Sequence, residues 1–418
     1  MNRMIKNEYV YSIITRFITI IISLCQSILV ARYLGAALKG TSVYIKSITS
    51  IGAIIVTFGM HQAYPFFRKK YGKDNIFIAY INAVRIIFAT EFVICIVIAS
   101  VVSNIDIKIS IFLIPIMGFA DVLSYVCMIE SPNIRNKWWT IIYFFDMLLV
   151  AFLMLFTSAN LLTAVMILTF ADVFKIIVYS IIVKTRILIN KQCLLIIKEI
   201  ITFGFFPMLA LLMTTLNYRI DVIMLKMSPS ITDELIGIYS IGINVAERIV
   251  LVPDTLKGIL ASKLSKGADN KEVSKICRLC LYVSLILCIA AMAVGKWGIC
   301  LLYGSEYNNS YTVMSICALG AVFIGYFKLI AQYNIINKKQ IYNVIILSIS
   351  ILVNIVGNLL FIPAYGINGA ALATCLGHIV CGAVFIIQFC KNTNTKLKNM
   401  VVINKNDLRL LKKIRESK

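Results

Sequence analysis

The segment TTLNYRIDVIML, residues 214–225, places two ionisable side chains, Arg219 and Asp221, inside an otherwise apolar stretch. An Arg guanidinium offers several hydrogen-bond donors that suit phosphate or carboxylate groups, whereas an Asp carboxylate can pair with a base or hold a cation. Side chains two positions apart on a helix point in different directions, so these two cannot be each other's main partner. Each therefore needs a partner on another helix or a ligand.

Charged side chains recur inside the other apolar stretches of the chain. A charge at the centre of a bilayer costs roughly 2.5 to 3.5 kcal/mol on insertion scales, so such residues normally face the protein interior or a water-filled cavity. The apolar stretches contain more basic residues, Arg16, Arg32, Lys46, Arg85, Lys175, Arg219, Lys226, Arg248, Lys257, Lys296 and Lys328, than acids, Glu91, Asp121, Asp146, Asp172, Asp221, Glu247 and Asp254. Some basic residues near helix ends reach the interface, but the sequence predicts a net cationic interior.

Two of these basic residues lie on stripes of polar residues. Arg16 shares a helical face with several Ser and Thr residues between positions 12 and 27, and Lys46 shares one with those between positions 42 and 57. Close packing of small residues would account for the Ser and Thr but not for the two charges, so we predict a water-lined cavity. For residues 214–225 and the following helix, the alternative is a fixed ion-pair network that holds the two helices together.

The elements that position these residues are membrane-spanning helices. Of the 418 residues, 60% are hydrophobic and 14% are charged, and apolar runs of bilayer length recur from end to end. The sequence predicts an all-α polytopic membrane protein with twelve transmembrane helices near residues 8–32, 40–62, 77–102, 109–130, 139–158, 160–183, 200–226, 234–261, 279–302, 311–335, 341–361 and 367–390. The start, MNRMIKNEYV, lacks a signal-peptide cleavage site, so we expect the first helix to stay as an anchor.

The net charge of +22 is explained by the placement of the basic residues. With a cytoplasmic N-terminus, 28 of the 41 Lys and Arg fall in inner segments, and the outer loops hold only Lys39 and Lys108. This asymmetry predicts that both termini face the cytoplasm and leaves no need for nucleic acid as a partner. The basic tail, residues 391–418, is expected either to lie on anionic membrane lipids or to be solvated.

Cofactor and metal motifs are missing from the sequence. The 12 cysteines lie in predicted helices or on the inner side, which argues against a disulfide framework, and the pair Cys277 and Cys280 has neither a second pair nor a nearby His to complete a metal site. There is no Walker A motif, and we assign the glycines of GINGAALATCLG, residues 366–377, to a turn and to close helix packing. We therefore predict no metal, no cofactor and no catalytic residues.

An internal repeat divides the chain. The first and second helices join through ARYLGAALKGTSVYIKSITSIG, and the seventh and eighth join through LKMSPSITDELIGIYSIGINVAERI. In both cases a charged helix is followed by a short outer turn, then by a helix with a glycine and an aromatic residue near its start. The repeat predicts two pseudo-symmetric six-helix bundles around a central cavity, residues 1–190 and 191–390, followed by the tail of residues 391–418.

Three segments carry a family resemblance: RYLGAALKG after the first helix, YRIDVIMLKMSPSITDELIGIYSIGINVAERI across the seventh and eighth, and LLFIPAYGINGAALAT entering the last. Together they resemble bacterial polysaccharide transporters, in particular O-antigen flippases of the multidrug/oligosaccharidyl-lipid/polysaccharide exporter superfamily. The resemblance extends over the whole chain in length, helix number and motif order. One departure is Gly40-Thr41-Ser42, where relatives usually have Gly-x-Tyr.

The resemblance implies a flippase that moves an undecaprenyl-pyrophosphate-linked oligosaccharide, an O-antigen or capsule repeat unit, across the bacterial inner membrane by alternating access. The implied partners are this glycan, membrane lipids, a polysaccharide polymerase and a chain-length regulator. The groups expected to face the substrate are Arg16, Lys46, Arg219 and Arg248, followed by Arg85 and Lys328. Asp146, Asp221 and Glu247 are expected to position these bases or to carry a coupling ion, with an ion gradient as the expected driving force.

Three other functions compete with this reading. A multidrug or cation exporter of the same superfamily would have a net acidic cavity. A peptidoglycan-precursor flippase would usually have fourteen transmembrane helices. A membrane polysaccharide polymerase or ligase would need a sizeable outer loop, and the predicted outer loops are all short, so we expect no enzymatic activity.

Overall fold

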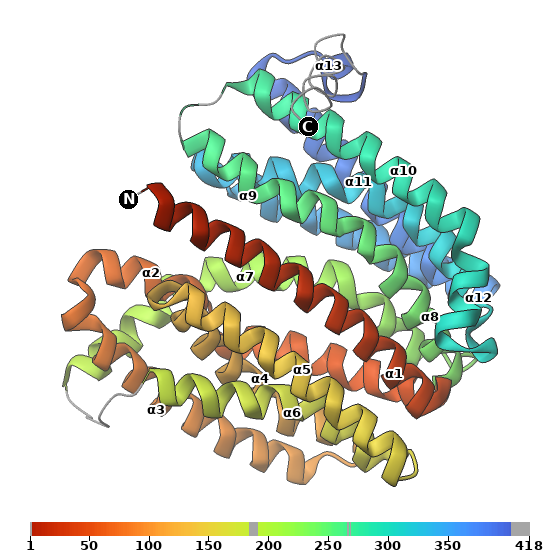
Figure 1. Ribbon diagram of the computed structural model, residues 1–418, viewed down its shortest axis with the longest axis horizontal. Helices are drawn as coiled ribbons and strands as arrows, with labels where there is room; N and C mark the ends of the chain where they lie inside the picture. The colour runs from red at the N-terminus through yellow and green to blue at the C-terminus, as the bar shows by residue number, and fades with distance from the viewer. Residues whose placement is uncertain (1, 184–190, 266, 268, 403–418) are drawn as a thin grey trace. The chain divides into compact units, whose positions relative to one another are not determined.

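The computed structural model describes residues 2–183, 191–265, 267 and 269–402, with the backbone alone at residues 2–14, 16, 73–75, 191, 192 and 265. These residues form helices joined by short turns, and none of the residues so described lies in a β-strand (Figure 1). The predicted all-α fold class is confirmed.

Ten helical stretches in the described residues are long and apolar enough to cross a membrane. One crossing needs about 20 residues. The stretches Phe17–Tyr71, of 55 residues, and Ile341–Thr393, of 53 residues, are each long enough for two crossings. Counted in this way, the described part of the chain supplies the twelve predicted crossings, and the chain is a multi-pass membrane protein.

The chain divides into two compact units, unit 1 with residues Met1–Thr215 and unit 2 with residues Leu216–Lys418. The boundary between them falls inside a single helix, α7 (Lys191–Met227). The boundary predicted from the repeat, after residue 190, lies before this helix. It stays a prediction about which parts of the chain move together.

Unit 1 contains six helices and most of α7. The six are α1 (Asn2–Thr57), α2 (Met60–Tyr71), α3 (Lys73–Val101), α4 (Ile105–Glu130), α5 (Pro132–Phe156) and α6 (Leu161–Ile182). Side-chain caps explain two of the starts: Asn104 accepts a hydrogen bond from the backbone N–H of Ile107, and Asn160 and Thr163 form a capping box. Aromatic residues such as Tyr64, Phe67 and Tyr80 fill the core where α2, α3 and α7 meet.

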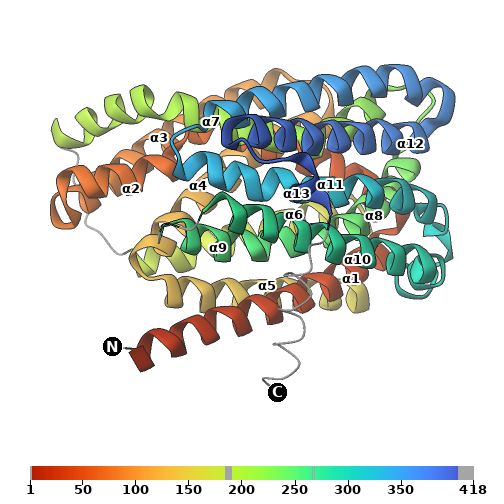
Figure 2. The ribbon, with the colours of Figure 1, turned by 90° about the horizontal axis from the view of Figure 1, so that it is seen from above.

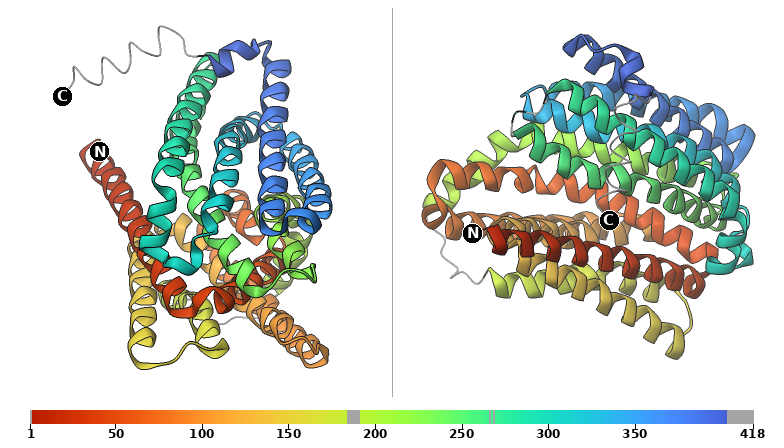
Figure 3. Two further views of the ribbon diagram at one scale, coloured as in Figure 1. Left: turned by 90° about the vertical axis from the view of Figure 1, so that its right-hand side faces the viewer. Right: turned by 45° about the horizontal axis from the view of Figure 1, so that its top comes forward.

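Unit 2 contains the end of α7 and the rest of the chain. Its helices are α8 (Asp233–Ala246), η1 (Glu247–Val250), α9 (Leu251–Ser265), α10 (Asn270–Tyr303), η2 (Ser305–Tyr307), α11 (Ser310–Ile336), α12 (Ile341–Thr393) and α13 (Leu397–Val401). Figure 3 shows α13 lying beside the ends of α10 and α12, where Arg278 donates a hydrogen bond to the carbonyl of Asn399. Residues 403–418 of the predicted basic tail lie outside the described residues.

The two longest helices are each interrupted by a glycine. In α1 the break is at Gly35 (φ 68°, ψ 173°), and in α12 it is at Gly366 (φ 57°, ψ −132°). A residue with a side chain rarely adopts such a positive φ, which is why glycine marks both turns. Figure 1 shows α1 doubling back on itself, and Figure 2 shows the same for α12. These turns lie where the sequence places the short outer loops.

A third break separates α1 from α2 and was not predicted. Phe58 and Gly59 both have positive φ, of 42° and 71°. A Cβ added to Gly204 of α7 would lie 1.9 Å from the carbonyl oxygen of Phe58, so the two backbones touch at this point. The residues that follow, predicted as an inner loop over 63–76, instead form the helix α2, whose final turn contains Arg68, Lys69 and Lys70.

The eighth predicted helix, residues 234–261, is divided by a short 3₁₀ segment. The α-helical pattern changes at Glu247–Val250, immediately before Leu251 and Pro253. Proline has no backbone N–H, so Pro253 cannot bond to the carbonyl four residues earlier, and the chain tightens there. The result is that Glu247 and Arg248 lie at an interruption of the helix and not in a regular turn.

Candidate functional site

The most completely built polar site in unit 2 surrounds Asp221 of α7, which is 2% exposed. Its carboxylate accepts a hydrogen bond from the hydroxyl of Tyr239 on α8 and one of 2.8 Å from the backbone N–H of Val222. The hydroxyl of Thr374 on α12 lies 3.4 Å from the same carboxylate. The partners of this charge are therefore neutral groups from two other helices.

Amide side chains of α12 extend the site. Asn354 donates a hydrogen bond of 3.1 Å to the hydroxyl of Thr374, and Asn358 donates one of 2.8 Å to the amide oxygen of Asn354. The hydroxyl of Ser350 donates to the amide oxygen of Asn217 on α7 at 2.7 Å. All of these residues are buried. We call Asn217, Asp221, Tyr239, Ser350, Asn354, Asn358 and Thr374 the Asp221 cluster.

The Asp221 cluster could hold a cation. It combines one carboxylate with amide and hydroxyl oxygens, which are the ligand types that hard cations prefer. Among the described residues, the buried amide oxygen of Asn358 has no hydrogen-bond donor. The site is too poor in acids to suggest a transition metal, because no group of three or more His, Cys, Asp or Glu in the described part of the chain could hold one.

The guanidinium of Arg219 lies half-buried on α7, and no hydrogen bond or ion pair joins it to a described residue. Its charge acts on Glu247, as do the charges of Asp221, Arg248 and Lys328. One carboxylate oxygen of Glu247 is buried without a hydrogen-bond partner among the described residues. Unit 2 therefore brings four other predicted site residues within electrostatic reach of Glu247.

The ion pairs found among the described residues of unit 2 do not include Asp221 or Glu247, the two acids there that were predicted to pair with bases. Lys226 and Asp233 form an ion pair of 2.6 Å that joins α7 to α8. Lys328 on α11 lies 3.2 Å from Asp254 and 5.5 Å from the ring centre of Tyr218. The positive charge of Lys328 is thus largely compensated, which weakens its case as a substrate-binding group. Among the described contacts, Asp221 has the hydroxyl of Tyr239 as its partner, and the pairing of Asp221 or Glu247 with a base stays a prediction.

Unit 1 holds the other predicted residues. Asp146 on α5 is 3% exposed and accepts a hydrogen bond from the side-chain amide of Gln26 on α1. Lys46 lies exposed on α1, and Arg85 on α3 donates a hydrogen bond of 3.1 Å to Asn82, one turn away. The side chain of Arg16 lies outside the described residues.

Several contacts of the site were not predicted from the sequence. Tyr239 is the aromatic residue of the repeat near the start of its helix, but its role as partner of Asp221 arises from the way α8 packs on α7. Thr374 lacks any local signal. Asn354 and Asn358 did carry one: two Asn residues four positions apart on a membrane helix share a face and need polar partners. In unit 1 the three-residue spacing of Asp172 and Lys175 could have indicated their ion pair of 2.8 Å.

Comparison with known proteins shows which solved structures have a similar fold. No protein-family model matches the chain, and no curated protein matches it in sequence. The structure is similar to that of the lipid II flippase MurJ in its inward closed conformation, with a TM-score of 0.73 and 16% identity over 98% of this chain and 93% of that one. The chain therefore shares the fold of this flippase.

Two transporters of the MOP superfamily are similar as well. An inward-facing multidrug resistance MATE transporter gives a TM-score of 0.67 at 11% identity, over 93% of this chain and 99% of the other. A MOP transporter from Pyrococcus furiosus, described by the reverse polarity of its binding pocket, gives 0.58 at 11% identity, over 93% and 95%. The fold that the predicted superfamily implies is therefore confirmed. Identities this low establish the fold alone.

Proposed function

We propose that the chain is a flippase that moves an undecaprenyl-pyrophosphate-linked oligosaccharide, an O-antigen or capsule repeat unit, from the inner to the outer leaflet of the bacterial inner membrane. The observation that carries this proposal is the similarity to the lipid II flippase MurJ over nearly the full length of both chains. The excess of basic over acidic residues in the apolar stretches supports an anionic substrate, because a pyrophosphate is attracted to Arg and Lys.

Arg219 is the group that we assign first to the pyrophosphate. Its guanidinium has no hydrogen bond or ion pair with a described residue, so a ligand does not have to displace a protein partner. Arg248, Lys46, Arg16 and Arg85 would add positive charge, and Lys328, with Asp254 as its partner, would contribute least. The substrate would cross as residues 1–190 rock against residues 191–390.

The Asp221 cluster is the best candidate for ion coupling. A buried carboxylate with amide and hydroxyl oxygens around it can bind a monovalent cation or a proton in one conformation and release it in another. Asp146 and Glu247, with one buried oxygen each that lacks a hydrogen-bond donor among the described residues, would position nearby bases or share this role.

The test is complementation in a strain that lacks the gene and accumulates the lipid-linked oligosaccharide. Arg219→Ala is expected to abolish surface polymer at normal protein level, whereas Arg219→Lys retains part of it because the charge remains. Lys296→Ala, which removes an exposed basic residue of α10, serves as the control and should export normally. Wild-type surface polymer in the Arg219→Ala strain would remove this assignment.

Export of cations or drugs is the second candidate, because the MATE transporters share the fold. The basic excess of the apolar stretches opposes it, since a cationic drug would be repelled. A drug-susceptibility panel in the same strains separates the two functions. A polymerase or ligase function is opposed by the short connections on the predicted outer side, such as residues 102–104 and 157–160. Polymerase and chain-length regulator partners, the inner-membrane location and cytoplasmic termini remain part of the proposal.

A further inference from the structure

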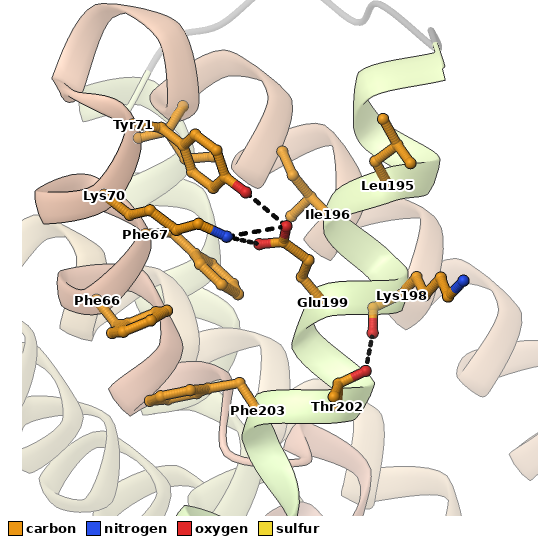
Figure 4. Close-up of a pocket in the computed structure, with 11 residues that line it drawn as sticks. Phe66, Phe67, Lys70, Tyr71, Leu195, Ile196, Lys198, Glu199, Thr202 and Phe203 are labelled. Atoms are coloured by element: carbon orange, nitrogen blue, oxygen red, sulfur yellow. Dashed lines mark hydrogen bonds and ion pairs between the residues drawn. The ribbon is translucent and has the colours of Figure 1, made fainter.

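A pocket of about 820 Å³ opens in unit 1 between α2 and the first turns of α7 (Figure 4). Its volume lies in the range of roughly 300 to 1,000 Å³ that is typical of small-molecule sites. One side of the pocket is formed by Phe66, Phe67 and Phe203, and the other by Lys70, Tyr71 and Glu199. The flippase function proposed above makes no use of this pocket.

The apolar side is open to its surroundings. The rings of Phe66 and Phe203 stack with their centres 4.6 Å apart and an angle of 16° between their planes. Phe66 is 46% exposed and Leu195, one turn before Glu199, is 63% exposed. Exposed aromatic and aliphatic side chains of this kind, at the end of a membrane helix, suit contact with hydrocarbon chains.

The polar side already binds an anionic group. The ammonium of Lys70 lies 3.2 and 3.4 Å from the two carboxylate oxygens of Glu199, and the hydroxyl of Tyr71 donates to one of them at 2.5 Å. Figure 4 shows all three side chains meeting between α2 and α7. The side chains of Lys70 and Glu199 are 47% and 36% exposed, so this ion pair is only weakly stabilising and can exchange.

The surroundings of the pocket are positively charged. Lys69 and Lys198 are both exposed, and Arg68 pairs with Glu130 at 2.5 Å. The predicted topology puts residues 63–76 and 184–199 on the cytoplasmic side, where the membrane surface carries anionic lipids. The pocket therefore combines an apolar surface with basic residues on the predicted cytoplasmic side of the membrane.

We propose that this pocket binds an anionic phospholipid of the cytoplasmic leaflet. Its phosphate takes the place of the Glu199 carboxylate between Lys70 and Tyr71, and an acyl chain lies along Phe66, Phe203 and Leu195. Glu199 acts as an internal competitor that occupies the anion position when no lipid is bound. A free phosphate ion lacks the acyl chain and has no apolar contact to gain from the pocket.

The test uses the purified full-length protein in mixed micelles with phosphatidylglycerol or phosphatidylcholine, and native mass spectrometry to count bound lipid. Phosphatidylglycerol is expected to bind more tightly. Lys70→Gln should lower its affinity about fivefold, the loss expected for one basic residue beside an anionic lipid. Glu199→Gln breaks the same ion pair but should raise the affinity, and Phe66→Ala should weaken binding of both lipids.

Lys263→Gln is the matched control, because Lys263 is 46% exposed and pairs with Glu272 in unit 2 in the same way. It should leave lipid binding unchanged. The proposal is overturned if Lys263→Gln and Lys70→Gln act equally, if the two lipids bind alike, or if Glu199→Gln fails to raise the affinity. Displacement of bound phosphatidylglycerol by inorganic phosphate alone would also overturn the proposal, because it would show that the site binds an anion without needing an acyl chain.

Discussion

Two buried charges, Lys175 in unit 1 and Asp221 in unit 2, are held in different ways. In unit 1, Lys175 is 7% exposed and lies 2.8 Å from Asp172 and 4.0 Å from Asp121, so its charge is balanced by acids. In unit 2, the most buried carboxylate, Asp221, is held by Tyr239 and Thr374, and the surrounding groups are amides and hydroxyls. The first site neutralises a buried charge with opposite charge, and the second solvates it with neutral dipoles.

This difference matters for function. A balanced ion pair resists change, because removal of one partner leaves the other buried and unpaired. A carboxylate held by neutral donors keeps its net charge, so it can attract a cation or proton without first breaking an ion pair. The comparison therefore favours a structural role for Lys175 and a functional role for Asp221. Substitutions at these residues and their partners test both roles.

The largest expected effect is that of Lys175→Met. Loss of this ammonium leaves Asp172 and Asp121 without their base, and removing one partner of a buried ion pair typically destabilises by about 3 to 5 kcal/mol. The free energy of unfolding can be measured by SDS titration of the purified protein in mixed micelles. A variant as stable as the wild type would show that the ion pairs do not hold unit 1 together.

Tyr239→Phe should have the next largest effect. It removes a hydrogen bond to a charged group, a contribution of about 1.5 to 3 kcal/mol. The same unfolding measurement applies, with Tyr303→Phe as control, since Tyr303 is 3% exposed and its hydroxyl has no hydrogen bond to a described residue. Equal losses in the two variants would mean that the contact with Asp221 contributes nothing specific.

Asp221→Asn should separate stability from transport. The amide keeps an oxygen for Tyr239 and is nearly the same size, so the loss of stability is expected to stay below about 1.5 kcal/mol. Export should nevertheless fall at least about tenfold, which is about 1.4 kcal/mol in the barrier, if the charge carries the coupling ion. Undiminished surface polymer would make the Asp221 cluster a structural element like the ion pairs of unit 1.

The smallest effect is expected for Lys263→Gln. Its ion pair with Glu272 is exposed, and such surface pairs usually contribute about 0.2 to 1 kcal/mol. The unfolding measurement should therefore give a value close to that of the wild type. A loss as large as that of Lys175→Met would show that burial does not govern the strength of these pairs.

Helix positions were largely predictable from the sequence. Predicted residues 109–130 became α4 (Ile105–Glu130), and residues 311–335 became α11 (Ser310–Ile336). The transfer of apolar side chains into lipid is a local and nearly additive quantity, so a run of such residues marks its own boundaries. Gly366, one of the glycines that the sequence assigned to a turn, marks the break of α12 for a similarly local reason, whereas the break of α1 at Gly35 was not assigned to a particular residue.

The partners within the site were not predictable in the same way. That Asp221 needs a polar partner follows from its burial, but the choice of Tyr239 over a base depends on how α7 is rotated against α8 and α12. This rotation results from packing between residues far apart in the chain. The helix α2 was missed because its Arg and Lys residues are typical of a loop, while its aromatic side is buried by contact with α3, α4 and α7.

The contact of Phe58 and Gly59 with Gly204 has a mechanical consequence. Two backbones meet there with no side chain as a spacer, so there is no slack to absorb a displacement. A tilt of the first half of α7 would therefore be passed on to α2 through this backbone contact. Lys70 of α2 and Glu199 of α7 form their ion pair beyond this contact, so a tilt of one helix against the other would change the distance between them.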